Sequence, residues 1–142
     1  MFKFNSTLDK TSVKNISSLT LAFIGDAVYS LFVREKLVFY KDEKGSELNR
    51  KTAKVVCASS QADFIDFLMP YLTSEEIEVY KRGRNVKKST RAKNATVGEY
   101  NKSTGFEALV GYLYVLGEID RLNYLLNLKD EMDKQKDKNV WK

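Results

Sequence analysis

Two acidic residues in apolar surroundings are the side chains of this sequence best suited to chemistry. Asp26 lies in the middle of LTLAFIGDAVYSLFVREKL, residues 19–37, and Glu107 lies in STGFEALVGYLY, residues 103–114. An ionised carboxylate buried among apolar groups is costly unless it is paired, hydrogen-bonded or bound to a metal. Each of the two is followed by an alanine. Two such helices packed together would direct both carboxylates at one point.

Both carboxylates also have a purely structural interpretation as helix caps. Gly25 can end a short helix, with Asp26 as the N-cap of the next one. The spacing from Thr104 to Glu107 matches a capping box. The apolar run continues on both sides of Asp26 without a cluster of polar turn residues, which favours a functional carboxylate there. The cap interpretation stays open for both positions.

The composition excludes several kinds of catalysis. The chain has no histidine, which removes Ser-His and Cys-His nucleophiles, histidine acid–base chemistry and histidine-ligated metals. The lone cysteine, Cys57, excludes an internal disulfide and argues against structural zinc. Cys57 lies in an apolar run and is predicted to belong to the core. If the protein is a hydrolase, carboxylates with a hard cation such as Mg²⁺ are the main remaining route.

The sequence pattern predicts an all-α fold in one domain, residues 1–142. One proline and seven glycines, against abundant Leu, Lys, Glu and Ala, favour helices. Residues 1–15 are predicted to be a polar arm, and residues 83–102 a long loop, which is often functional at that length. Helices are predicted at 19–37, 46–71, 74–82, 103–116 and 119–132. The segment 46–71 is expected to divide at Ser59-Ser60 and to end at Pro70. A Thr73–Glu76 capping box opens the helix at 74–82, and Gly117 closes the helix at 103–116.

The helix at 19–37 is apolar nearly all round. Its apolar residues recur at near-helical spacing and are predicted to form a stripe that faces the core: Leu19, Phe23, Val28, Leu31 and Phe32. A helix of this kind belongs inside a bundle or at a subunit interface. No apolar run approaches the ~18 residues that span a bilayer, and no export signal precedes this helix. We therefore expect a cytoplasmic protein with no membrane contact.

Positive charge is concentrated in one segment. The net charge is +5, but residues 81–102 hold eight basic residues and one acid, a local charge of +7 that leaves −2 for the remainder. This distribution is typical of a surface that binds a polyanion, although a solvated loop or an anionic lipid contact are alternatives. The candidate RNA-binding residues are Lys81, Arg82, Arg84, Asn85, Lys87, Lys88, Arg91 and Lys93.

Three stretches resemble a known family. FIGDAV, at 23–28, resembles the signature motif of the ribonuclease III family, and FEALVGYLY, at 106–114, resembles that family's second motif. The length and KRGRN, at 81–85, resemble the Mini-III branch, which consists of the nuclease domain without a double-stranded-RNA-binding domain. The resemblance extends over about residues 17–128. It implies a helical bundle like the ribonuclease III endonuclease domain.

The resemblance also assigns the two carboxylates. It implies that Asp26 is the central catalytic and metal-binding residue and that Glu107 is its partner metal ligand. Full-length family members carry acids four residues before the aspartate and three before the glutamate, where this chain has Ala22 and Thr104. Two carboxylates are therefore expected at the site rather than four.

The function implied by the resemblance is a Mg²⁺-dependent endoribonuclease, with Mn²⁺ as a possible substitute. It would cleave double-stranded RNA to leave 5′-phosphate ends, act on the precursor of large-subunit (23S) ribosomal RNA and form a homodimer. A ribosomal protein that presents the substrate is a further candidate partner. The alternatives are a non-catalytic RNA-binding or ribosome-assembly module, which would keep the basic segment, and a helical adaptor that only dimerises.

Overall fold

The computed structural model describes residues 6–87 and 94–142. Over these residues the chain forms α-helices and one short 3₁₀ helix, with no strand, so the all-α prediction is confirmed. The helices are α1 (Lys10–Lys14), α2 (Ser18–Tyr40), α3 (Gly45–Val56), α4 (Ala58–Leu68), the 3₁₀ helix η1 (Met69–Tyr71), α5 (Ser74–Asn85), α6 (Val97–Leu116) and α7 (Ile119–Gln135).

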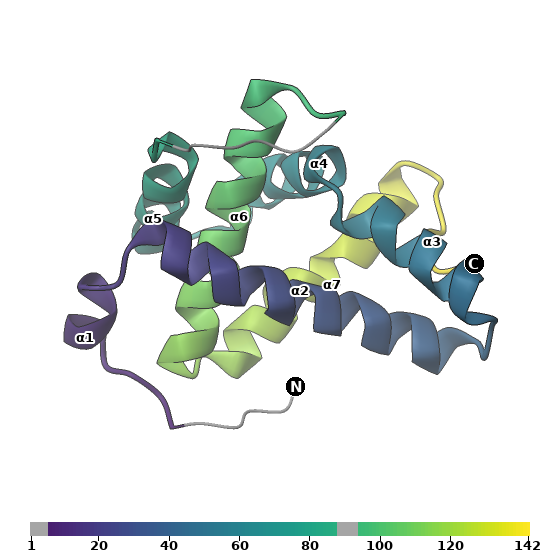
Figure 1. Ribbon diagram of the computed structural model, residues 1–142, viewed down its shortest axis with the longest axis horizontal. Coiled ribbons are helices and arrows are strands. Elements are labelled where there is room, and N and C mark those ends of the chain that lie inside the picture. Colours follow the sequence, from purple (N-terminus) through teal and green to yellow (C-terminus); the bar gives the residue numbers. More distant parts are fainter. Residues whose placement is uncertain (1–5, 88–93) are drawn as a thin grey trace.

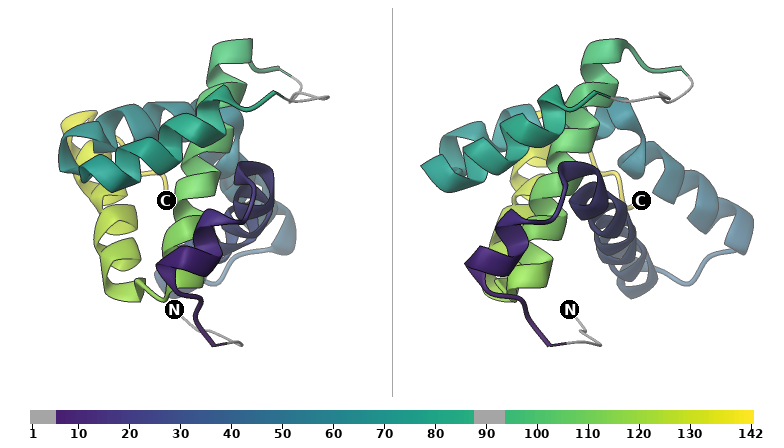
Figure 2. Two further views of the ribbon diagram at one scale, coloured as in Figure 1. Left: turned by 90° about the vertical axis from the view of Figure 1, so that its left-hand side faces the viewer. Right: turned by 60° about the vertical axis from the view of Figure 1, so that its left-hand side comes forward.

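Helix α6 is the centre of the bundle. Helices α2, α4 and α5 pack most extensively against it, and α1 and α7 also contact it. Figure 1 shows the long helix α2 crossing α6, and the two views of Figure 2 show α5 crossing the upper part of α6. The two helices that carry Asp26 and Glu107 are therefore direct neighbours.

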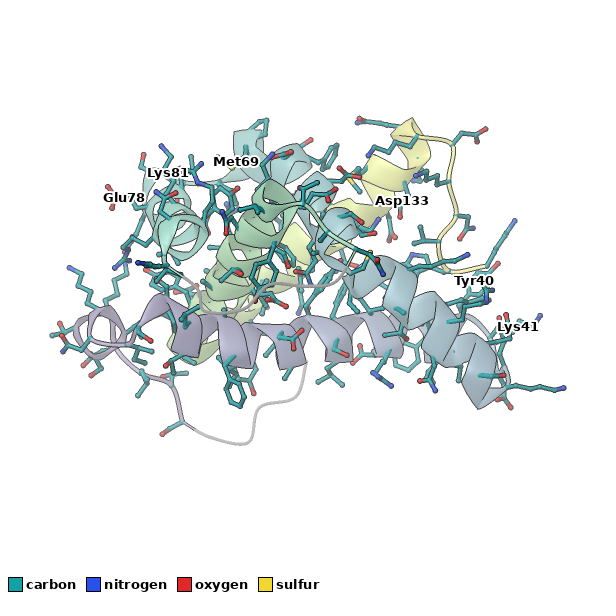
Figure 3. All side chains as sticks on the ribbon, turned by 45° about the horizontal axis from the view of Figure 1, so that its top comes forward. Tyr40, Lys41, Met69, Glu78, Lys81 and Asp133 are labelled. Carbon is teal, nitrogen blue, oxygen red and sulfur yellow. The ribbon has the colours of Figure 1, made fainter. Side chains whose placement is uncertain are left out.

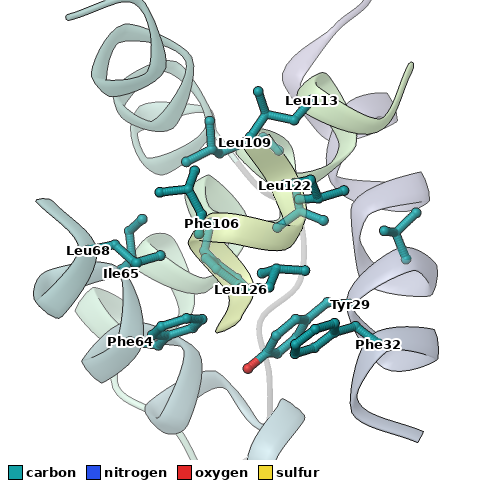
Figure 4. Close-up of a cluster of buried hydrophobic side chains, with 14 of the residues drawn as sticks. Tyr29, Phe32, Phe64, Ile65, Leu68, Phe106, Leu109, Leu113, Leu122 and Leu126 are labelled. Carbon is teal, nitrogen blue, oxygen red and sulfur yellow. The ribbon is translucent and has the colours of Figure 1, made fainter. Parts of the chain in front are cut away.

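An aromatic cluster joins α2, α4 and α6 in the core (Figure 4). The ring of Tyr29 meets that of Phe106 edge-on with centroids 4.9 Å apart, and Phe64 lies 5.6 Å from Phe106. All three side chains are almost completely buried. Edge-to-face pairs add to the stabilisation that burial provides. Because Phe106 directly precedes Glu107 and Tyr29 follows Asp26 by about one turn, this cluster joins α2 to α6 close to the two carboxylates in sequence.

Neither carboxylate caps a helix. Helix α2 runs unbroken from its N-cap Ser17, so Asp26 lies in its interior. Helix α6 begins at Val97, where Thr96 and Glu99 form the capping box, and Glu107 lies ten residues further along. The hydroxyl of Thr104 donates instead to the backbone carbonyl of Tyr100, at 3.1 Å. Both cap interpretations are therefore wrong.

The loop predicted at 83–102 is shorter than expected. Helix α5 continues to Asn85 and α6 starts at Val97. The first turns of α6 are rich in polar residues and lack the apolar stripe on which the prediction depended, but the Thr96 capping box starts the helix there. Of the candidate RNA-binding residues, Lys88, Arg91 and Lys93 lie outside the described residues.

The break in the 46–71 segment falls at Cys57 rather than at Ser59-Ser60. Cys57 is exposed, so its assignment to the core was wrong. Its thiol lies at the junction of α3 and α4, 3.2 Å from the Ser60 hydroxyl, and that hydroxyl donates to the carbonyl of Lys54. The polar contacts of a helix junction therefore place this sulfur at the surface despite its apolar neighbours in sequence.

The other predicted boundaries are close to the observed ones. The capping box of Thr73 and Glu76 opens α5, and Gly117, with a φ of 80°, closes α6 in the left-handed region that glycine favours. Pro70 lies in the 3₁₀ turn that ends α4. Helix α7 extends three residues beyond its predicted end, to Gln135, and the predicted N-terminal arm contains the short helix α1.

Helix α2 has a buried and an exposed apolar face. Val28 and Phe32 of the predicted stripe face the core, but Leu19, Phe23 and Leu31 are exposed, and Phe23 is 82% exposed. The single core-facing stripe was therefore wrong in part, because spacing alone cannot choose a face on a helix that is apolar all round. Among the described helices, none has the combination of length and apolar character needed to cross a bilayer.

Candidate active site

Two glycines bring the backbones of α2 and α6 into contact beside the carboxylates. A Cβ atom at Gly25 would lie 1.8 Å from the carbonyl oxygen of Glu107, and one at Gly111 would lie 1.9 Å from the carbonyl oxygen of Leu21. No other residue type fits such an approach without moving a helix. The glycine that precedes Asp26 therefore sets the distance between its helix and that of Glu107.

The side chains of Asp26 and Glu107 meet at this crossing. Burial, followed by the hydrogen bond with Asp26 and the negative charge of Asp26, raises the pKa of Glu107 to about 8. Glu107 is partly buried, whereas Asp26 is exposed. The expectation that Asp26 is buried was therefore wrong. The pair forms a site that is open to solvent on the Asp26 side.

A buried amide contacts the inner carboxylate. Gln61 of α4 is 1% exposed, and its Nε2 donates to Oε2 of Glu107 at 3.5 Å. The hydroxyl of Ser103 donates to Oε1 of Gln61 at 2.5 Å, which fixes the orientation of the amide. The Gln61 contact favours the ionised form of Glu107 and lowers its pKa, against the larger effects of burial and of Asp26.

Gln61 and Ser103 were not among the site residues predicted from the sequence. One signal was available: Gln61 shares a helical face with the buried residues Phe64, Ile65 and Leu68, at spacings of three, four and seven. A polar side chain on an apolar face needs a buried partner, because an unpaired one is costly. That partner lies on α6, 42 residues away, and only the packing of α4 on α6 identifies it.

The two positions at which the resembled motifs carry further acids supply no carboxylate here. Ala22 and Thr104 are both buried, and the described residues contain no group of three or more His, Cys, Asp or Glu side chains able to hold a metal ion. Two adjacent carboxyl groups nevertheless suit a divalent cation, because the cation would offset both negative charges when both groups are ionised. All available ligands are oxygens, the kind that Mg²⁺ and Mn²⁺ prefer. The donor set therefore fits a small hard cation.

Part of the basic segment lies at the C-terminal end of α5. Lys81, Arg82, Arg84 and Asn85 belong to that helix, and Lys87 follows it; Figure 3 shows Lys81 on α5. The guanidinium of Arg84 lies 5.6 Å from the centre of the Tyr80 ring and donates to Oδ1 of Asn85 at 3.0 Å.

A second glycine contact holds this end of α5 on α6. A Cβ atom at Gly83 would lie 2.9 Å from Cα of Gly105, and one at Gly105 would lie 2.6 Å from the carbonyl oxygen of Tyr80. Gly105 precedes Glu107 by two residues. Lys81, Arg82 and Arg84 are thus carried on a helix that is packed tightly against the helix of Glu107.

Comparison with known proteins gives a consistent result. The model of the ribonuclease III domain matches residues 19–118. The chain is similar to the Mini-ribonuclease 3 of Clostridium tetani, with 45% identity over 120 residues, 84% of this chain and 80% of that protein. It is 46% identical to the Mini-ribonuclease 3 of a Thermoanaerobacter species over 121 residues, 85% of each chain. A Fusobacterium nucleatum protein of known crystal structure has a TM-score of 0.77 at 27% identity, over 85% of this chain and 97% of that one.

Proposed function

Because this chain belongs to the ribonuclease III family, we propose that Asp26 and Glu107 are its catalytic, Mg²⁺-binding residues and that its substrate is a double-stranded precursor of large-subunit ribosomal RNA. The chain is an endoribonuclease, a hydrolase that leaves 5′-phosphate products. Enzymes of this family generally depend on a divalent metal and act on double-stranded RNA. The roles of the individual residues, the choice of Mg²⁺ and the precursor are the proposal.

One observation carries the assignment of the site. Asp26 and Glu107 are in contact where α2 and α6 cross, and Glu107 has a pKa of about 8 there. A carboxyl group at such a place is costly as a purely structural feature, since burial and a like charge both disfavour its ionised form. Neither residue caps a helix. A cation site explains the arrangement, because a bound cation makes the doubly ionised pair favourable.

The residues of the chain have separate tasks in this mechanism. A bound cation would supply positive charge that activates a water molecule and offsets the charge that develops on the phosphate. Glu107 would be its partly buried ligand and would have to give up its proton to bind it. Gln61 keeps the carboxyl group of Glu107 in place and favours its ionised form. Asp26 is the ligand on the exposed side, where RNA can approach.

The basic end of α5 supports the choice of RNA as the polyanion. Lys81, Arg82 and Lys87 are exposed, and the helix that carries the first two packs on α6 near Glu107. Duplex RNA is recognised mainly by its shape and its backbone. Lysine and arginine contacts to phosphate position such a duplex without reading its sequence. These residues, with Lys88, Arg91 and Lys93 in the same segment, are proposed to hold the duplex across the carboxylate pair.

We also propose a two-fold symmetric homodimer built on the exposed face of α2. Leu19, Phe23 and Leu31 lie on that face, on the same helix as Asp26. Apolar side chains of this size are exposed at a cost unless a partner covers them. Two-fold dimers are the commonest homo-oligomers. A dimer of this kind would place two catalytic pairs on one duplex, one for each strand.

The site of action and a protein partner complete the proposal. Processing of a ribosomal RNA precursor would take place in the cytoplasm, and a ribosomal protein bound to the precursor is the candidate that presents it. These assignments depend on the resemblance to the Mini-III branch and on the Mini-ribonuclease 3 relatives. The test compares the cleavage rate of a precursor helix with that of an unrelated duplex of equal length, each with and without ribosomal protein. This comparison distinguishes a dedicated processing enzyme from a general duplex nuclease.

The test of the proposed function is cleavage of duplex RNA by the purified chain in Mg²⁺, with EDTA as the metal-free control. We expect cuts only in Mg²⁺, with 5′-phosphate and 3′-hydroxyl ends. A matched reaction with single-stranded RNA of the same sequence should remain uncut. Salt-sensitive binding of the duplex without any cleavage would contradict the proposal and favour a non-catalytic RNA-binding module.

A further inference from the structure

A second candidate site lies on the side of the molecule formed by α3, α4, α7 and the C-terminal segment. A cavity of about 440 Å³ opens there, and we call it the lysine pocket. Neither Asp26 nor Glu107 lines this cavity. Figure 3 shows Asp133 of the lysine pocket on α7, at the opposite side of the molecule from Lys81 on α5. The cavity is therefore separate from the basic end of α5.

Positive charge dominates the lysine pocket. Seven Lys or Arg side chains line it, against two carboxylates, Asp63 and Asp133. Three of the seven are neutralised: Arg50 pairs with Glu47, Lys51 with Glu43, and Lys129 with Asp133. The other four form no ion pair within the part of the chain that the structure describes: Lys54, Lys136, Lys138 and Lys142. Unpaired cations that converge on one cavity attract an anion, and phosphate is the anion for which lysine is a common ligand.

A buried carboxylate oxygen in the lining has no partner. Asp133 is 4% exposed, and its Oδ1 accepts a hydrogen bond from Nζ of Lys129 at 2.8 Å. Its Oδ2 is the one buried side-chain polar atom in the described residues without a hydrogen-bond partner. An acceptor left in this state is costly. Because this oxygen is buried, the Asp133 side chain must turn toward the cavity before a hydroxyl or amino group of a bound molecule can donate to it.

The lining also contains apolar side chains. Val55, Met132 and Val140 contribute to the wall, each from a different part of the chain: α3, α7 and the C-terminal segment. The volume of the cavity lies in the range of ~300–1,000 Å³ that is usual for small-molecule sites. The three features together favour a ligand with a phosphate, a hydrogen-bond donor and an apolar or flat surface.

We propose that the lysine pocket binds a ribonucleotide, with its phosphate among the unpaired lysines and a hydroxyl or amino donor on Oδ2 of Asp133. Two sources share this chemistry: a free nucleotide, and a nucleotide unit of an RNA strand outside the cleaved bond. The proposal does not depend on the catalytic role of Asp26 and Glu107. Helix α4 touches both places, since Ser60 and Asp63 line the lysine pocket and Gln61 contacts Glu107.

The test measures binding in EDTA, so that no RNA is cut and no metal bridges a nucleotide to the catalytic pair. The probes are ADP, ribose 5-phosphate, inorganic phosphate and a duplex RNA, titrated into the whole chain by calorimetry. The pocket variant is Lys54→Ser with Lys136→Ser. The matched control, Lys14→Ser with Lys134→Ser, removes the same charge from residues outside the lysine pocket.

Two patterns would support the proposal. If ADP binds, the pocket variant should weaken its binding by about tenfold or more, and the control variant by less than about twofold. ADP should also bind more tightly than inorganic phosphate, which lacks the ribose and the base. If ADP does not bind but the pocket variant alone weakens duplex RNA binding, the nucleotide belongs to an RNA strand.

Other patterns would overturn it. Equal binding of ADP and inorganic phosphate would mean a simple anion patch without a nucleotide site. Equal losses in the pocket and control variants would mean a non-specific charge effect. Since every readout is binding in EDTA, failure here leaves the proposed nuclease function untouched, and loss of cleavage in Mg²⁺ leaves this proposal untouched.

Discussion

The backbone of Gly25 lies directly against the carbonyl oxygen of Glu107, with only 1.8 Å available for a Cβ atom at that position. Replacement of Gly25 by alanine must therefore separate α2 from α6 and move the two carboxylates apart. We expect Gly25→Ala to lower the free energy of unfolding by roughly 1–3 kcal/mol and to impair cleavage of duplex RNA. Denaturant unfolding and initial cleavage rates measure the two effects.

Gly45→Ala is the matched control for this prediction. Gly45 is also helical, but a Cβ atom there would meet nothing within 4 Å. Alanine should be neutral or stabilising by up to about 1 kcal/mol at such a position. If the Gly25→Ala and Gly45→Ala variants had the same free energy of unfolding and the same rate of RNA cleavage, the close helix crossing would have no role in the site.

Replacement of Asp26 by asparagine should abolish most cleavage without unfolding the protein. Asp26 is exposed in the interior of α2, so the change removes a charge but neither a cap nor core packing. We expect the cleavage rate to fall by more than ~100-fold. This loss exceeds the one usually seen when a residue that only hydrogen-bonds to a metal ligand is replaced. Asp42→Asn, on the exposed connector after α2, is the control. Turnover of Asp26→Asn near the wild-type level would remove Asp26 from the catalytic centre.

The raised pKa of Glu107 predicts how stability depends on pH in the metal-free protein. The ordinary pKa is 4.5 and the folded value is about 8, so the folded state keeps a proton that the unfolded chain releases. This contribution to stability is fully present below about pH 4.5 and is lost as pH rises through 8. We therefore expect the free energy of unfolding in EDTA to fall between these values, as measured by urea titrations at pH 5 to 9.

The same proton links metal binding to pH. A cation that needs Glu107 ionised should release about one proton per site at pH 7 and bind more tightly as pH rises toward 8. Calorimetric titration with Mg²⁺ in buffers of different ionisation enthalpy counts these protons. Glu107→Gln is the control, because it should lose the proton release, the pH slope and most of the metal affinity. Proton release that persisted in Glu107→Gln would place the titrating group elsewhere.

Gln61 is predicted to act as a positioning residue for Glu107. Gln61→Met keeps much of the volume but removes the donor to Glu107 and leaves the hydroxyl of Ser103 without its acceptor. Because Gln61 lowers the pKa of Glu107, its loss should move the acidic limb of the pH–rate profile to higher pH and cut the cleavage rate by ~10–100-fold. Gln135→Met, at an exposed position at the end of α7, is the matched control. A slower enzyme with an unshifted pH profile would indicate a structural role only.

Phe23 should stabilise the proposed dimer but not the fold. Its side chain is 82% exposed, so Phe23→Ser removes little core packing. If Phe23 is central to the interface, its loss should weaken dimerisation by roughly 30-fold or more, the effect of a typical hot-spot residue. Light scattering over a range of concentrations measures this, with Val97→Ser on α6 as the control at another exposed apolar position. A wild-type protein that is monomeric at micromolar concentration would contradict the dimer itself.

Local patterns in the sequence were sufficient to predict most helices and the two carboxylates. The capping box at Thr73 and Glu76, the end of α4 at Pro70 and the glycine that closes α6 were all predicted correctly. These features depend on residues only a few positions apart, whose spacing is fixed by the geometry of a helix. Asp26 and Glu107 stood out for a similar reason, since each interrupts an apolar run.

What the sequence by itself determined was therefore an all-α chain with two unusual carboxylates and one basic segment, and the tertiary structure decided the rest. Glu107 owes its raised pKa to burial and to Asp26, 81 positions earlier in the chain. The contact of Gln61 with Glu107 and the exposure of Phe23 and Cys57 likewise depend on which helix faces lie together. The physical reason is that helical periodicity operates over a few residues, whereas burial, pKa and close backbone contact are set by groups that only the packing of separate helices makes neighbours.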